Sequence, residues 1–122
     1  MYEISVRGHF DAAHALRGYK GKCESLHGHR FEVMVTVQAQ KLNEIGISYD
    51  FTELKRHLRE VLEGLDHHNL NETPPFAKLN PSSENLAAIL YREMASRLRD
   101  APVALARVQV WESPDASATY SL

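Results

Sequence analysis

A long alternation of apolar and polar side chains from His29 to Ala39 is the feature that most limits the fold of this chain. Successive side chains of a β-strand point to opposite faces, so this segment predicts a long strand with one buried face. Residues 2–6 alternate in the same way, and that strand can continue to His14 with a bulge at Gly8. Residues 17–25, with two glycines and three basic side chains, form the loop of a predicted antiparallel hairpin.

Two later segments change to helical spacing. Apolar residues recur at steps of three and four over 51–65, which predicts an amphipathic helix packed on the sheet. A second helix is expected to begin at Ser82 or Ser83, because a hydroxyl there can cap free N–H groups. Residues 103–112 and 116–121 predict two more strands. The order ββααββ indicates an α+β fold, a four-stranded antiparallel sheet with two helices on one face.

The composition is that of an ordinary globular protein. With 122 residues, 43% hydrophobic and 25% charged, we expect a single domain over 1–122. The net charge of −2 gives no reason to expect nucleic acid or a membrane as partner, and neither a membrane-spanning stretch nor a signal peptide is expected. One cysteine cannot form an internal disulfide, so a cytoplasmic protein is expected. The two edges of the sheet favour a homo-oligomer.

Histidine is unusually frequent in this chain, with seven residues. His27 and His29 lie two apart, so in an extended chain both imidazoles point to one side and can meet at one metal ion. His14, at the end of the partner strand, is the best candidate for a third ligand. Three histidines without a fourth protein ligand predict an open, catalytic zinc site. A turn with exposed imidazoles is the alternative.

Three further residues could transfer protons. Cys23 lies four residues before His27, among lysines that favour its thiolate form, and could act as nucleophile or base. A small buried side chain is the alternative for Cys23. Asp66 precedes His67 at the end of the first helix and could orient the imidazole for proton transfer, although a solvent-exposed helix end would give the same dipeptide.

Glu112 closes an alternating strand and shares a face with two valines. A carboxylate on a buried face needs a partner, and its two oxygens suit a ligand that presents two parallel N–H groups. The alternative is a strand end in solvent.

Six segments of this chain, taken in order, resemble the 6-pyruvoyl-tetrahydropterin synthase family over essentially the whole length. They are Phe10-Asp11-Ala12-Ala13-His14, Cys23-x3-His27-Gly28-His29, Asp50-Phe51, Leu65-Asp66-His67, Pro81-Ser82-Ser83-Glu84-Asn85 and Trp111-Glu112-Ser113-Pro114. The short spacing between Cys23 and His27 is similar to the bacterial branch of the family, which makes 6-carboxytetrahydropterin for queuosine biosynthesis.

The resemblance implies the tunnelling fold (T-fold), in which subunits join their sheets into a β-barrel with active sites at subunit boundaries. It also implies a role for each motif residue: zinc ligands His14, His27 and His29, catalytic Cys23, Asp66 and His67, pterin-anchoring Glu112, and pterin contacts at Ser82 and Ser83, where the family often has threonine.

The implied substrate is 7,8-dihydroneopterin triphosphate, and the implied products are 6-carboxytetrahydropterin, acetaldehyde and triphosphate. Arg17, Lys20 and Lys22 of the loop are then candidates to contact the triphosphate, or solvated charges. Two alternatives stay open. One is the pyruvoyl-forming reaction on the same substrate, and the other is a zinc-stabilised pterin-binding module without catalysis.

Overall fold

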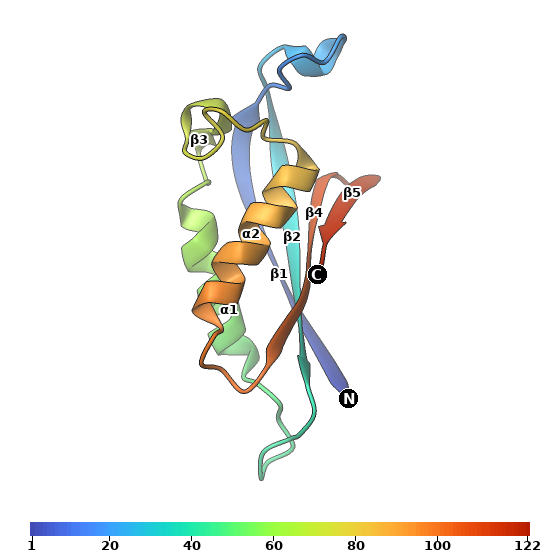
Figure 1. Ribbon diagram of the computed structural model, residues 1–122, viewed down its shortest axis with the longest axis vertical. Helices are drawn as coiled ribbons and strands as arrows, with labels where there is room; N and C mark the ends of the chain where they lie inside the picture. Colours follow the sequence, from blue (N-terminus) through green and yellow to red (C-terminus); the bar gives the residue numbers. More distant parts are fainter.

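The computed structural model describes residues 1–122 apart from the side chain of Cys23. Two helices cover one face of a sheet with strand order β3-β1-β2-β4-β5 (Figure 1). The helices are α1 (Phe51–Glu63) and α2 (Ser83–Arg97), and the strands are β1 (Tyr2–His14), β2 (His27–Ala39), β3 (His68–Asn69), β4 (Ala104–Ser113) and β5 (Ala116–Tyr120). Two short 3-10 turns, η1 (Lys22–Glu24) and η2 (Leu70–Glu72), lie in the connections. The predicted α+β fold is confirmed.

β1 and β2 form the long hairpin that the alternation predicts. They pair antiparallel without a break from Tyr2 opposite Ala39 to His14 opposite His27. β2 therefore begins at His27, two residues before the predicted start. The continuous register decides which side chains meet at the loop end of the hairpin, where the histidines lie.

The sheet differs from the prediction at the β1 edge. The four long strands are antiparallel as expected, but β3 adds a fifth strand that pairs parallel with β1, Ala12 opposite His68 and Ala13 opposite Asn69. The sheet is therefore mixed and five-stranded. A strand of two residues is too short to show an alternating pattern, so residues 66–81 carry only loop signals in the sequence.

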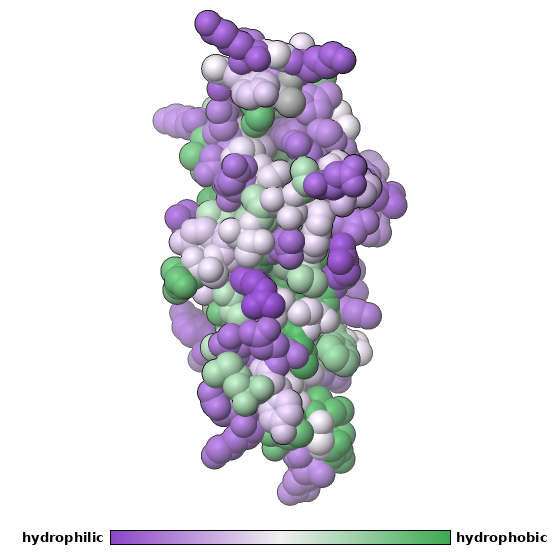
Figure 2. Space-filling view, turned by 90° about the vertical axis from the view of Figure 1, so that its right-hand side faces the viewer, coloured by the Kyte–Doolittle hydropathy of each residue, from purple (hydrophilic) through white to green (hydrophobic). Residues whose placement is uncertain are grey.

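The surface is largely hydrophilic on the face shown in Figure 2, with hydrophobic side chains gathered toward its lower end. The connection from β2 to α1 forms the lower end of the molecule in Figure 1, and it contains the exposed Leu42, Ile45 and Ile47. Among the helices of the described chain, none has the length and apolar character needed to cross a membrane.

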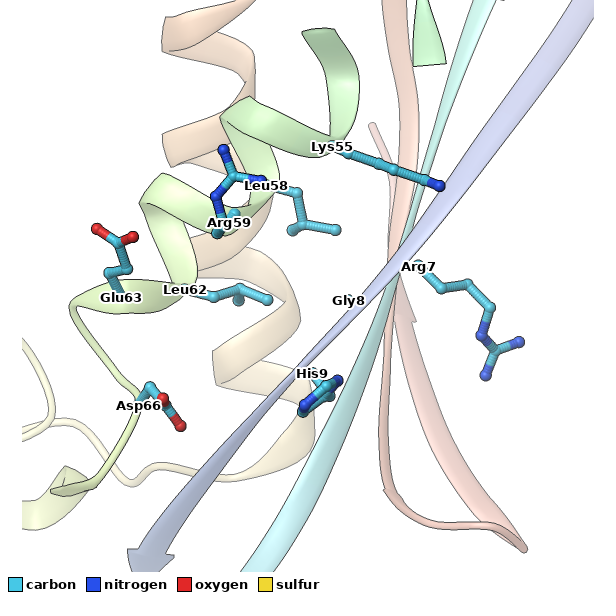
Figure 3. A pocket seen from close by; sticks show the side chains of 9 residues that line it. All are labelled: Arg7, Gly8, His9, Lys55, Leu58, Arg59, Leu62, Glu63 and Asp66. Carbon is cyan, nitrogen blue, oxygen red and sulfur yellow. The ribbon is translucent and has the colours of Figure 1, made fainter. Parts of the chain in front are cut away.

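Apolar side chains between the sheet and the helices form the core. Phe10 and Phe31 are fully buried and stack with their ring centroids 4.9 Å apart. Gly8 lies where α1 comes close to β1, because a Cβ at this position would be 3.1 Å from side-chain atoms of both Leu58 and Leu62 (Figure 3). The missing side chain lets α1 approach β1 closely. This packing holds the loop after α1 beside the edge of β1.

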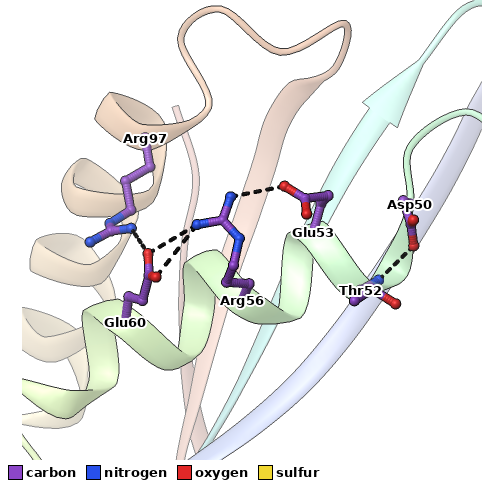
Figure 4. Close-up of polar contacts among 6 residues, drawn as sticks. All are labelled: Asp50, Thr52, Glu53, Arg56, Glu60 and Arg97. Carbon is purple, nitrogen blue, oxygen red and sulfur yellow. Dashed lines mark hydrogen bonds and ion pairs between the residues drawn. The ribbon is translucent and has the colours of Figure 1, made fainter.

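Polar contacts fix the start of α1 and join the two helices (Figure 4). Asp50 caps α1 by accepting the backbone N–H of Thr52 at 2.8 Å. Glu60 accepts hydrogen bonds from Arg97 of α2 at 2.6 Å and from Arg56 at 3.3 Å. The hydrogen bond from Arg97 is the main reason that the pKa of Glu60 lies below its ordinary value.

Two asparagine side chains hold the connection between β3 and α2 against the end of β1. Asn71 accepts the N–H of Ala15 at 2.8 Å and donates to its carbonyl oxygen at 2.9 Å. Asn80 makes the same pair of bonds with the backbone of Arg17, at 3.0 and 2.9 Å. The Arg17 guanidinium donates to the carbonyl oxygens of Asn71 and Phe76. The connection is therefore fastened beside the histidine end of β1.

Candidate active site

The three predicted histidine ligands come together at the loop end of the hairpin. His14 lies directly opposite His27, and Ala12 lies opposite His29. The ring centroids of His14 and His27 are 4.7 Å apart, those of His14 and His29 are 5.1 Å apart, and those of His27 and His29 are 4.7 Å apart. One potential ligand atom from each ring lies within 4.8 Å of the others. The side chains form a compact cluster.

Backbone carbonyl groups orient two of the rings. Nδ1 of His14 lies 2.8 Å from the carbonyl oxygen of Pro81, and Nδ1 of His27 lies 2.6 Å from that of Ser25. A carbonyl oxygen only accepts, so in both rings Nδ1 carries the hydrogen, and in the neutral imidazole Nε2 then keeps its lone pair. In metal-binding histidines one ring nitrogen commonly donates to a carbonyl oxygen in this way, which orients the ring so that the other nitrogen can bind the metal.

The cluster leaves buried nitrogen atoms without hydrogen bonds. Nε2 of His14 and Nε2 of His29 are both buried, and neither has a hydrogen-bond partner among the described residues. Burial is the main cause that lowers the pKa of His29, against an opposing effect of Glu112, and it favours the neutral form that binds metals. Neutral imidazole nitrogens at this spacing fit a zinc ion, which would give both atoms a partner.

Glu112 lies against the same cluster. Its Oε1 is 3.1 Å from Nε2 of His14 and 3.7 Å from Nε2 of His29, and its side chain is 30% exposed. The sequence predicts a carboxylate that needs a partner, and the structure places two histidines beside it. Four side chains, three imidazoles and one carboxylate, therefore form a candidate metal centre.

Asp66 and His67 lie on the edge of β1. The backbone N–H of His67 donates to the carbonyl oxygen of Asp11 at 2.6 Å, and the N–H of Asp11 donates to Oδ1 of Asp66 at 2.8 Å. The second oxygen of Asp66 lies 3.0 Å from Nδ1 of His67. The backbone of His67 has φ = 58°, in the left-handed region. Mainly through the bond from Asp11, the pKa of Asp66 lies below its ordinary value, so the carboxylate is ionised beside the imidazole.

One hollow lies at the edge of β1. Its lining includes Asp11, Arg30 and His67, and of the three clustered histidines it includes His29. A second hollow lies between α1 and β1 (Figure 3), where Lys55 reaches toward the strand and Asp66 lies beside the loop that follows the helix. Asp66 therefore lines the second hollow, whereas His67 lines the first.

The serines predicted to contact the ligand lie at the start of α2. Ser82 is the N-cap and its hydroxyl accepts the N–H of Asn85 at 3.1 Å, as the capping prediction requires. Ser83 is the first residue of the helix. The carbonyl of the preceding Pro81 bonds to His14, so the beginning of α2 adjoins the histidine cluster.

The side chain of Cys23, the predicted catalytic thiol, lies outside the described part of the structure. Its backbone belongs to η1, in the connection between β1 and β2. In the same connection Lys20 and Lys22 are exposed. The guanidinium of Arg17, which is exposed, donates to carbonyl groups of the β3–α2 connection. A contact of Arg17, Lys20 or Lys22 with the triphosphate stays a prediction.

Sequence reasoning missed Asp11 and Arg30. Nε of Arg30 donates to Oδ1 of Asp11 at 3.1 Å, and a second guanidinium nitrogen donates to Oδ2 at 3.3 Å. The signal that could have found this pair is the hairpin register, because pairing His14 with His27 also places Asp11 opposite Arg30.

A T-fold subunit that carries both a histidine–glutamate cluster and an aspartate–histidine pair defines a class of pterin-converting lyases. The chain belongs to the 6-pyruvoyl tetrahydropterin synthase family, whose model matches residues 3–122.

Relatives and solved structures agree with this family. The chain is 37% identical over 126 residues to a 6-carboxy-5,6,7,8-tetrahydropterin synthase of Synechocystis, with 98% of this chain and 93% of the relative covered. It is 36% identical over 109 residues to a dihydroneopterin monophosphate aldolase of Pyrococcus furiosus, with 89% and 88% covered. The solved 6-pyruvoyl tetrahydropterin synthase of Caenorhabditis elegans superposes with a TM-score of 0.88 at 28% identity, covering 98% of this chain and 94% of that one.

Proposed function

We propose that this protein is a zinc-dependent 6-carboxytetrahydropterin synthase. It converts 7,8-dihydroneopterin triphosphate to 6-carboxytetrahydropterin, acetaldehyde and triphosphate, a step of queuosine biosynthesis in the cytoplasm. The observation that carries the proposal is the pair of buried Nε2 atoms of His14 and His29, which have no hydrogen-bond partner among the described residues. Relatives at 37% identity that carry this name support the choice of reaction.

In this proposal His14, His27 and His29 hold the zinc ion through Nε2. When bound, zinc supplies Lewis-acid polarisation of the oxygen atoms on the substrate side chain, which makes the neighbouring C–H groups more acidic. Although Oε1 of Glu112 lies 3.1 Å from Nε2 of His14, we assign this carboxylate to the pterin ring and not to the metal, because its two oxygens can accept two parallel N–H groups. Ser82 completes the ring contacts at the start of α2, with Ser83 beside it.

Proton transfer in the proposed reaction needs a group on each face of the substrate side chain. Cys23 acts as a thiolate base on one face. His67 acts on the other face, and the ionised Asp66 orients its imidazole through the 3.0 Å contact with Nδ1. Triphosphate leaves by elimination. Water is the second reactant and supplies an oxygen of the new carboxylate, as cleavage of a carbon–carbon bond releases the two-carbon fragment as acetaldehyde.

Mass spectrometry of the pterin product tests this assignment. The zinc-loaded protein is incubated with 7,8-dihydroneopterin triphosphate and, in a second reaction, with the monophosphate, because one relative is named as an aldolase of the monophosphate. We expect 6-carboxytetrahydropterin and acetaldehyde from the triphosphate. A 6-pyruvoyl product, turnover of the monophosphate alone, or binding without turnover would each overturn the assignment. The zinc assignment is tested by His27→Ala, which should lose zinc and activity together. His57→Ala, a change on α1, is the matched control and should keep both.

We also propose that the active site is shared between subunits of a homo-oligomer. Cys23 lies in the hairpin connection, whereas Asp66 lies after α1 on the β1 edge. Cys23→Ala and Asp66→Ala should each be nearly inactive alone. When the two are mixed and reassembled, some boundaries combine an intact Cys23 with an intact Asp66, and activity should return to a fraction of wild type. No recovery in mixed oligomers verified by native mass spectrometry would place the whole set within one chain.

A further inference from the structure

Two carboxylates, not one, lie within reach of the His67 imidazole. Potential ligand atoms of Asp11, Asp66 and His67 all lie within 4.8 Å of one another. Both carboxylates are equally accessible, with side chains 41% exposed. Only Asp66 makes the 3.0 Å contact with Nδ1 of His67. Something must therefore keep the Asp11 carboxylate away from the ring.

Arg30 occupies the Asp11 carboxylate completely. Its Nε donates to one oxygen at 3.1 Å and its terminal nitrogen donates to the other at 3.3 Å, so both oxygens face the planar guanidinium. The two residues stand opposite each other on β1 and β2. The hydrogen bond from Arg30 is also the main cause that lowers the pKa of Asp11, against the opposing charge of Asp66. Asp11 and Arg30 therefore form a bidentate ion pair.

The backbone of Asp11 holds the aspartate–histidine pair in place, whereas its carboxylate could compete with Asp66 for the imidazole. Its N–H holds Oδ1 of Asp66 and its carbonyl holds the N–H of His67. The same residue thus anchors the aspartate–histidine pair and carries a carboxylate that could compete for the imidazole. Only the side chain has to be restrained.

We propose that Arg30 is a positioning residue for His67. By holding the Asp11 carboxylate on the β2 side, it leaves Asp66 as the one partner of Nδ1 and so fixes the direction in which Nε2 points. This inference rests on the proposed function in which His67 transfers protons. Arg30 acts through Asp11 and does not need to touch the substrate.

A rescue experiment in the zinc-loaded protein tests the proposal. Arg30→Gln frees the Asp11 carboxylate, which should lower kcat about ten- to a hundredfold with little change in KM, as expected for a misdirected catalytic group. Adding Asp11→Asn removes the competing charge but keeps the backbone anchor, so the double variant should recover most of the lost kcat. Arg107→Gln is the matched control, because it breaks a similar exposed pair with Glu3 on the same sheet.

Two results would overturn the proposal. If Arg30→Gln raises KM and Asp11→Asn restores nothing, Arg30 binds the substrate directly. If Arg30→Gln leaves kcat unchanged, the restraint on Asp11 has no function. Because Arg30 follows His29, zinc content is measured in every variant. Arg30→Lys, which keeps the charge without the two-pronged contact, should fall between wild type and Arg30→Gln, and it serves if Arg30→Gln fails to fold or loses zinc.

A second measurement separates this proposal from the proposed function, because it needs no substrate. Imidazole ¹⁵N spectra of His67 are recorded with and without Asp11→Asn. In protein that keeps Arg30, the His67 resonances should be insensitive to Asp11→Asn. In protein that carries Arg30→Gln, the same substitution should shift them. If this shift is seen but the protein turns over no pterin, the positioning role of Arg30 is supported and the proposed enzymatic reaction is rejected. Equal sensitivity in both backgrounds would reject the positioning role.

Discussion

His14 should contribute to folding as well as to metal binding, whereas His27 should contribute to metal binding alone. The His14 side chain is completely buried, and its Nδ1 donates to the Pro81 carbonyl. It also meets Phe31 edge to face, with ring centroids 5.2 Å apart. His27 is only partly buried, and its bond to Ser25 lies at the surface. His14→Ala and His27→Ala should therefore differ even when no metal is present.

The expected difference follows from three contributions. Losing the bond to Pro81 and leaving its carbonyl unpaired costs about 1–3 kcal/mol. Losing the contact with Phe31 adds about 1 kcal/mol. Removing the buried Nε2 of His14, which has no hydrogen bond to the described residues, offsets about 1 kcal/mol of this loss. His14→Ala should therefore lower the free energy of unfolding by about 1–3 kcal/mol, whereas His27→Ala should change it by about 0.5 kcal/mol or less.

Thermal unfolding in EDTA measures this difference. For a chain of this size 1 kcal/mol corresponds to roughly 4 °C, so His14→Ala should melt about 4–12 °C below wild type and His27→Ala within about 2 °C of it. Elemental analysis without EDTA should find zinc absent from both variants. Equal melting temperatures for the two metal-free variants would refute the reasoning, because the buried bond to Pro81 would then contribute nothing.

Three further predictions concern single side chains. Cys23→Ala should keep its zinc and lose about a hundredfold or more in kcat; loss of zinc would make Cys23 a ligand. Glu112→Gln should keep zinc and weaken binding of a pterin by about 2–3 kcal/mol in calorimetry, since a donor replaces one acceptor oxygen; unchanged affinity would remove it from the pterin site. Glu60→Gln should lower the melting temperature at pH 7, because the pKa of Glu60 is lowered in the folded state by its bond from Arg97. That stabilisation is present above the ordinary glutamate pKa of about 4.3 and is lost as the pH falls through the lower folded value, so the two melting temperatures should converge in acid. A difference that persists there would contradict the ion-pair explanation.

The hairpin and the histidine cluster could be predicted because both depend on local periodicity. Alternation placed residues 29–39 in a strand, and the two-residue step between His27 and His29 put both rings on one side. His14 followed from pairing the two strands. These inferences need only the geometry of a strand and its nearest neighbour.

Contacts that depend on register between distant segments could not be predicted. The approach of Glu112 to His14 requires the pairing of β4 with β2, which no local pattern specifies. The parallel pairing of β3 depends on where α1 ends and on how its loop meets Asp11. Arg17 was interpreted by its charge, and its bonds to carbonyl groups more than fifty residues away leave no sign in the sequence.

The asparagine contacts at the end of β1 have a consequence for the order in which this protein assembles. His14 can be oriented only when Pro81, 67 residues away, has arrived beside it, and Asn71 and Asn80 fasten the intervening connection to the same strand end. Contacts between segments so distant in sequence form slowly, because the chain must first lose the entropy of the closed loop. The orientation of His14 is therefore expected to be fixed late in folding, after the hairpin has brought the three histidines together. A metal ion that binds only after this step stabilises the folded state alone. It should therefore slow unfolding and leave the rate of folding unchanged.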